Sequence, residues 1–178
     1  VEIRGNRFEL ADEPREIVQI GAEPGRILRP YAFDRAADGS FVIADAPGGR
    51  GRVQFFSSSG SRFGGFALPG RERPLVTFDG LVLSGVGSIV YNGRSIFMSV
   101  PDSGSLVTEL GVDGVSARSF GELRVTGHEQ ERDLHVALNS GLVVLNPEGG
   151  FYFVFVAGVP TFRKYDHSGV LLFERHIE

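Results

Sequence analysis

Cysteine is absent from this 178-residue chain, and so is any long hydrophobic run. The absence of cysteine excludes disulfides and thiolate metal sites, and it fits the cytoplasm and a bacterial periplasm equally well. No apolar run approaches the roughly eighteen residues that a membrane-spanning helix needs, so no membrane span is expected. Basic charge is also scarce, because 18 Lys and Arg face 22 Asp and Glu and the formal net charge is −4. Such a chain has no basic field to hold phosphates, and we expect no nucleic-acid partner.

The amino-terminal segment does not have the charged and then apolar pattern of a signal peptide. The chain begins at Val1 rather than at an initiator Met, so we expect either that a leader was removed or that the sequence starts inside a longer gene product. The location stays open on these grounds, with a periplasmic or secreted protein slightly favoured over a cytoplasmic one.

Glycine and phenylalanine are abundant, with 25 Gly and 15 Phe but no Trp. Glycine at about twice its average frequency, together with many Phe, is typical of short strands joined by tight turns. We therefore expect an all-β protein without a long helix. The length and the 42% hydrophobic content suit one globular domain over residues 1–178.

Two sets of glycines recur with one period along the chain. Three hairpin glycines lie 54 and 55 residues apart, and three earlier turn glycines lie 54 and 56 residues apart; they are Gly60, Gly114 and Gly169, and Gly39, Gly93 and Gly149. A recurring unit of this length is typical of solenoids and propellers. The chain therefore contains three copies of one structural unit.

Each unit contains four short apolar segments that are expected to be strands. In the first unit they are Tyr31–Arg35, Phe41–Ala44, Val53–Phe56 and Arg62–Phe66. In the second they are Ser88–Tyr91, Ile96–Val100, Leu106–Leu110 and Ser116–Phe120, and in the third Leu142–Leu145, Phe151–Val156, Thr161–Tyr165 and Leu171–Arg175. Central strands that are apolar throughout and outer strands that alternate predict a β-propeller of four-stranded antiparallel blades, about three of which are in this chain. The blades span about residues 30–70, 85–123 and 138–178, and residues 1–29 supply a lead-in strand at Arg15–Gly21 and a linker.

The first unit also resembles an NHL repeat, the unit of a family of six-bladed β-propellers. The likeness rests on the glycine-rich linker "IGAEPG", Pro30 before the first strand, "DG" at Asp38 and Gly39, and "VIAD" ending in Asp45, followed by "RVQFF". In the second and third units, Val100 and Val156 occupy the positions that correspond to the neighbourhood of Asp45. The resemblance is therefore to the superfamily of NHL-like six-bladed propellers, in which lectin-like and enzymatic proteins share one shape.

Three blades and a lead-in strand make half of a six-bladed ring, and propellers rarely close with fewer than four blades. We expect either the remainder of a longer chain or self-association with a second copy to complete the ring. The end of the sequence, "LLFERHIE", is strand-like and has no capping segment, which favours a remainder beyond Glu178. Otherwise an open blade face exposes a large apolar patch.

Propeller ligands usually bind in loops at the central funnel, so the candidate ligand-binding residues are polar residues of those loops: Asp45, Arg50, Asp102, His128, Glu129 and His135. Asp45 has a second interpretation, in which it accepts backbone N–H groups or pairs with Arg52. The densest polar cluster runs from Thr126 to His135 and also holds Glu131 and Asp133. We expect this stretch to be a solvated loop between two blades.

The same polar stretch could hold zinc or calcium, because imidazole and carboxylate groups ligate these metals. It contains no H-E-x-x-H motif, and His128 and His135 are seven residues apart in an expected loop, so we assign no metal or other cofactor. The chain also lacks a G-x-S-x-G elbow and a P-loop. No catalytic residue is therefore assigned.

These observations favour a noncatalytic binding or scaffold module whose funnel or rim loops engage a protein, peptide or glycan partner. Two alternatives stay open. One is a propeller-type hydrolase or lyase whose funnel metal site is completed by residues outside this chain. The other is a structural subunit that packs in a larger assembly through its open blade faces.

Overall fold

The computed structural model describes residues 27–28, 30–45, 51–68, 75–84 and 88–177. In these ranges the chain forms strands, one short α-helix and one 3₁₀ turn, which confirms the expected all-β class. None of the described helices is long and apolar enough to cross a membrane. The predicted lead-in strand at Arg15–Gly21 lies outside the described residues.

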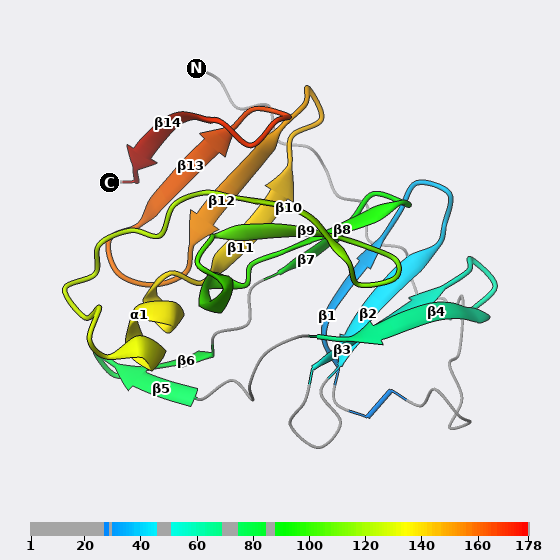
Figure 1. The fold of residues 1–178 in the computed structure, drawn as a ribbon, viewed down its shortest axis with the longest axis horizontal. Coiled ribbons are helices and arrows are strands. Elements are labelled where there is room, and N and C mark those ends of the chain that lie inside the picture. The colour runs from blue at the N-terminus through cyan, green and yellow to red at the C-terminus, as the bar shows by residue number, and fades with distance from the viewer. Residues whose placement is uncertain (1–26, 29, 46–50, 69–74, 85–87, 178) are drawn as a thin grey trace, which may run out of the picture.

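Three four-stranded antiparallel sheets make up most of the structure, and each uses four consecutive strands in sequential order (Figure 1). The first contains β1 (Pro30–Arg35), β2 (Phe41–Asp45), β3 (Arg52–Phe56) and β4 (Arg62–Ala67). The second contains β7 (Ile89–Tyr91), β8 (Ser95–Met98), β9 (Val107–Gly111) and β10 (Ser116–Phe120). The third contains β11 (Gly141–Leu145), β12 (Phe151–Phe155), β13 (Thr161–Tyr165) and β14 (Leu171–His176). All twelve predicted strands are present, with ends that differ from the prediction by two residues at most.

The sheets pack face to face in chain order through two apolar layers. Between the first and second sheets the buried side chains include Val42, Phe55, Tyr91, Ile96 and Met98. Between the second and third sheets they include Phe97, Val107, Phe120, Phe151 and Phe153. Successive side chains of a strand point to opposite faces, so a strand in a sheet that is covered on both faces must be apolar throughout. This explains β2, in which all five side chains are buried and the first four are apolar.

The two joints between sheets share one detail, which is a phenylalanine that covers the hairpin glycine of the following sheet. Gly114 has φ +81° and Gly169 has φ +89°, values that favour glycine. A Cβ atom added to Gly114 would lie 2.5 Å from the ring of Phe66, and one added to Gly169 would lie 2.7 Å from the ring of Phe120. Both the hairpin backbone and the neighbouring sheet therefore require glycine, which explains the regular spacing of these residues.

Two further elements lie together at the lower left of Figure 1. A hairpin of β5 (Leu75–Phe78) and β6 (Leu81–Ser84) follows the first sheet, and the helix α1 (Arg132–Leu138) follows the second. They pack through Val76, Phe78, Leu83, Leu134, Ala137 and Leu138. The expected loop around His135 is therefore wrong, because His135 lies on α1. Leu134, Ala137 and Leu138 are three and four residues apart, which gives this helix one apolar face.

Candidate functional site

Asp45, the last residue of β2, is fully buried and surrounded by hydrogen-bond donors. Arg52 Nε donates to Oδ1 at 2.8 Å and Arg52 Nη2 to Oδ2 at 2.9 Å. The N–H of Leu28 donates to Oδ2 at 3.2 Å, and Gln54 Nε2 donates to Oδ1 at 3.3 Å. Burial acts to raise the pKa of Asp45, but the hydrogen bonds and the Arg52 charge outweigh it and hold this pKa below its ordinary value. The carboxylate thus links β2, β3 and Leu28, and ligand binding by Asp45 stays a prediction.

The segment before α1 brings together three of the predicted site residues, His128, Glu129 and His135. Thr126 Oγ1 lies 2.7 Å from His135 Nδ1 and accepts the N–H of His128 at 3.2 Å. Glu129 Oε1 accepts the N–H groups of Thr126 and Gly127 at 2.8 and 3.1 Å and lies 4.0 Å from His135 Nδ1. The hydrogen bond from Thr126 is the main reason that the pKa of Glu129 is lowered.

His128 connects α1 to the β5–β6 hairpin. Its Nδ1 lies 2.9 Å from Glu131 Oε1, at the amino-terminal end of α1. Its ring meets the ring of Phe78 edge to face, with centroids 5.5 Å apart. Such a perpendicular contact is a favourable geometry for two aromatic rings. His128 therefore packs between the helix and the hairpin.

Asp102 belongs to the 3₁₀ turn η2 (Pro101–Ser103), which follows β8 of the second sheet. Its Oδ1 accepts Arg132 Nη2 at 2.9 Å and Arg132 Nε at 3.1 Å. Arg132 is the first residue of α1, so this ion pair ties the helix to the second sheet. A fourth predicted residue therefore lies in the same region, whereas Asp45 contacts Leu28 and residues of the first sheet. Arg50 lies outside the described residues.

The carboxyl-terminal end of α1 is held to the third sheet by Arg124 and Asn139. Asn139 is fully buried, accepts the N–H of Arg124 at 2.8 Å, and donates to the carbonyls of Arg124 and His135 at 3.2 and 3.1 Å. The guanidinium of Arg124 donates to the carbonyls of Leu138 and Ala157. It also lies 4.3 Å from the centroid of the Phe155 ring. These contacts fix the helix in one position.

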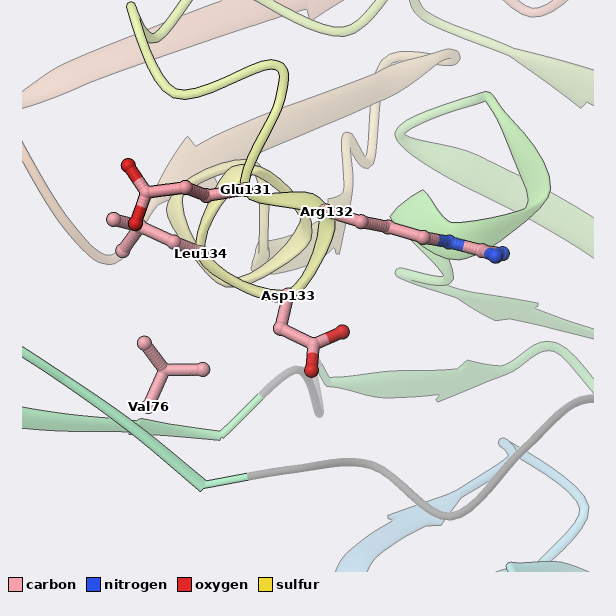
Figure 2. Close-up of a pocket in the computed structure, with 5 residues that line it drawn as sticks. All are labelled: Val76, Glu131, Arg132, Asp133 and Leu134. Carbon is pink, nitrogen blue, oxygen red and sulfur yellow. The ribbon is translucent and has the colours of Figure 1, made fainter.

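An open hollow of about 440 Å³ lies beside α1 and β5, lined by Val76, Glu131, Arg132, Asp133 and Leu134. Figure 2 shows Asp133 and Leu134 extending from the helix on the side of Val76, whereas Arg132 extends away from it. The positive charge of Arg132 is offset by its ion pair with Asp102. Glu131, whose Oε1 lies 2.9 Å from His128 Nδ1, and Asp133 place two carboxylates in the lining of the hollow, beside the apolar side chains of Val76 and Leu134.

The sequence identified only part of this hollow. Glu131 and Asp133 stood out because they belong to the densest polar stretch of the chain. Leu134 could have been found from the helical spacing of the apolar residues that follow this stretch. Val76 lies more than fifty residues earlier, in a hairpin that was not predicted, and no local pattern connects the two segments.

The polar stretch contains imidazole and carboxylate groups, which are ligands of zinc and calcium. Among the described residues, no three His, Asp or Glu side chains are grouped so that they could hold a metal ion. His128 and His135 each use Nδ1 in a hydrogen-bonding contact, with Glu131 and Thr126 respectively.

Neither a protein-family model nor a curated protein matches the sequence.

Proposed function

We propose that the three four-stranded sheets are consecutive blades of an NHL-like β-propeller, and that the protein is a noncatalytic module that binds a peptide or protein partner. The blade assignment is supported by the sequential strand order within each sheet. It is also supported by the joint at Gly114 and Gly169, which repeats from one sheet to the next.

The observation that carries the binding function is the hollow beside α1. Its lining offers the partly exposed Val76 for apolar contact beside Leu134, which is 9% exposed, together with the carboxylates of Asp133 and of Glu131, the second of which also contacts His128. Apolar surface that is removed from water supplies affinity, whereas a few placed polar groups fix orientation and specificity. The partner that suits this hollow carries Lys or Arg beside an aliphatic side chain.

The elements around the hollow are held rigidly, which also favours binding. The ion pair of Asp102 with Arg132 fixes the start of α1, and the buried Asn139 fixes its end. A preorganised surface loses less conformational entropy when its partner binds. The residues of the polar stretch thus shape the surface around the hollow.

Selection of peptides from a random library on the immobilised full chain tests this proposal. We expect the selected peptides to carry Lys or Arg next to Leu, Ile or Val. Their affinity should fall about tenfold in Asp133→Asn, because a charge contact at a partly desolvated rim is worth about 1.4 kcal/mol.

The matched control is Glu148→Gln, which removes a carboxylate from an exposed turn of the third sheet. This variant should bind the selected peptides like the unaltered chain. Peptides that bind Asp133→Asn as tightly as the unaltered chain would overturn the assignment of the hollow. If the library yields no binding peptide and the chain instead binds glycans on a parallel glycan array, the assignment of the partner would be overturned.

A further inference from the structure

The third sheet has a second apolar face, on the side opposite the second sheet. The side chains of Phe151, Phe153 and Phe155 are buried on the inner face, and those of Tyr152 and Val154 alternate with them on the outer face. Phe162 of β13 pairs with Val154 in the same register. On β11, Leu142 and Val144 are 45% and 46% exposed. We call this surface, with Phe173, Lys164 and Arg175, the outer face.

Aromatic rings cross the outer face from strand to strand, and two cations lie on them. The ring centroids of Tyr152 and Phe162 are 6.2 Å apart, and those of Phe162 and Phe173 are 5.9 Å apart. Lys164 Nζ lies 5.5 Å from the Tyr152 centroid, and Arg175 Cζ lies 5.6 Å from the Phe173 centroid. Within the described part of the chain, neither cation forms an ion pair. The outer face is therefore apolar and positively charged.

The pairing register shows what the outer face corresponds to in the other two sheets. Phe66 pairs with Val53 in the first sheet, and Phe120 pairs with Val107 in the second. These are the two phenylalanines that cover the hairpin glycine of the following sheet. Arg175 holds the same position in the third sheet, where it pairs with Phe162.

The joint between the second and third sheets also contains an arginine, whose hydrogen bond to the next hairpin is a precedent for Arg175. Arg118 lies two residues before Phe120, and its Nη1 donates to the carbonyl of His167 in the next hairpin at 2.8 Å. Phe173 and Arg175 are the same two residue types in the reverse order. The outer strand β14 thus carries the groups that make a joint between sheets.

We propose that the outer face is the seat of a further four-stranded sheet, which is not part of a second copy of this chain. Its hairpin meets Arg175 with carbonyl or carboxylate oxygens, and its apolar face covers Tyr152 and Phe162. Lys164 and Arg175 require acidic or carbonyl groups opposite them, because two buried cations without partners destabilise an interface. This inference rests on the proposal that the three sheets are equivalent blades, but it concerns a surface distinct from the hollow and does not depend on peptide binding there.

A second copy does not fit the outer face in either arrangement. Two outer faces placed together would bring Lys164 and Arg175 of both copies into one interface, and the strands carry no acidic side chain on this face. A head-to-tail arrangement would use the opposite face of the first sheet. Its residues Phe41, Ile43 and Phe56 are already less than a tenth exposed, and Ile27 packs on them, so that on this face Phe33, 61% exposed, is the large apolar side chain of β1 that a second copy would meet.

Site-specific photo-crosslinking in cells that make the whole natural protein tests the proposal. The probe p-benzoylphenylalanine replaces Phe162 in one variant and Val144 in another, so that the test does not depend on one substitution. The control replaces Val82, which is 67% exposed on the β5–β6 hairpin. We expect both outer-face probes to attach to a strand-turn-strand peptide with Gly, Asp or Glu in its turn, about tenfold more than the control.

Charge reversal at one residue gives a second measurement. Arg175→Glu should lower the crosslink yield at Val144 about fivefold, whereas Arg175→Lys should retain most of it. Attachment to residues 27–177 of a second copy would overturn the proposal. Attachment to lipid or to nuclease-sensitive material, or no attachment above the Val82 control, would overturn it as well.

Discussion

Gly114 lies where its own hairpin meets the neighbouring sheet, and this double contact can be measured. In Gly114→Ala the added methyl group meets the Phe66 ring in a backbone conformation that disfavours any side chain. We expect the free energy of unfolding in urea to fall by about 2–4 kcal/mol, which combines the backbone cost with overpacking. Gly114→Val should lower it further, because a β-branched residue tolerates positive φ poorly.

Gly104→Ala is the matched control for this substitution. Gly104 has φ +88°, close to that of Gly114, but nothing lies within 4 Å of an added Cβ atom. This variant should lose only the backbone part, about 1 kcal/mol. Equal losses in the two variants would show that Phe66 does not constrain Gly114.

Asp45 predicts a pH dependence of stability. Its pKa in the folded protein is below the unfolded value of about 3.9, so its contribution to stability is fully present above that value. The contribution is lost as the pH falls through the folded pKa. Asp45→Asn should therefore lower the free energy of unfolding by about 1–3 kcal/mol at pH 7, since it removes the charge partner of Arg52.

The same comparison at low pH supplies the check. The difference between Asp45→Asn and the unaltered chain should shrink as the pH falls from about 4 toward 2, because Asp45 itself becomes neutral. Glu148→Gln serves as the control, because this carboxylate lies on an exposed turn and has no ion pair in the described part of the chain. A difference that stays constant between pH 7 and pH 2 would contradict the account of Asp45.

At the scale of elements, α1 depends on the buried Asn139 at its carboxyl-terminal end. Asn139→Ala removes three side-chain hydrogen bonds, two to the backbone of Arg124 and one to the carbonyl of His135, which keeps the N–H of residue 139. We expect a loss of about 2–3 kcal/mol in the free energy of unfolding, with faster hydrogen exchange of the α1 amides. Asn146→Ala, on an exposed turn, should cost less than about 1 kcal/mol and leave exchange in α1 unchanged. Unchanged exchange in α1 of Asn139→Ala would contradict this role.

The elements differ in how far the sequence predicts them. The twelve strands of the three sheets are set by local signals, namely apolar runs such as Phe151–Phe155 and glycines at fixed spacing. The helix α1 was missed because its first residues are polar, and its apolar face spans only Leu134, Ala137 and Leu138. The hollow needs Val76 from a distant hairpin, and single-sequence patterns contain no information on such a contact.

At the scale of the whole molecule, the same joint between neighbouring sheets occurs twice, and two further surfaces are candidates for binding: the hollow beside α1 and the outer face of the third sheet. The joints place the three sheets face to face in chain order. The hollow beside α1 is bordered by carboxylates, whereas the outer face of the third sheet carries cations. The two surfaces therefore suit partners of opposite charge.

The central claim is that a basic peptide binds the hollow beside α1, and hydrogen exchange of the full chain with and without a selected peptide tests it most directly. Protection is expected in α1 and β5, because the lining residues belong to these elements and to the residue before α1. The amides of β14 should exchange at the same rate in both samples. Protection confined to β14, or no protection in α1 and β5 at a saturating peptide concentration, would contradict the claim.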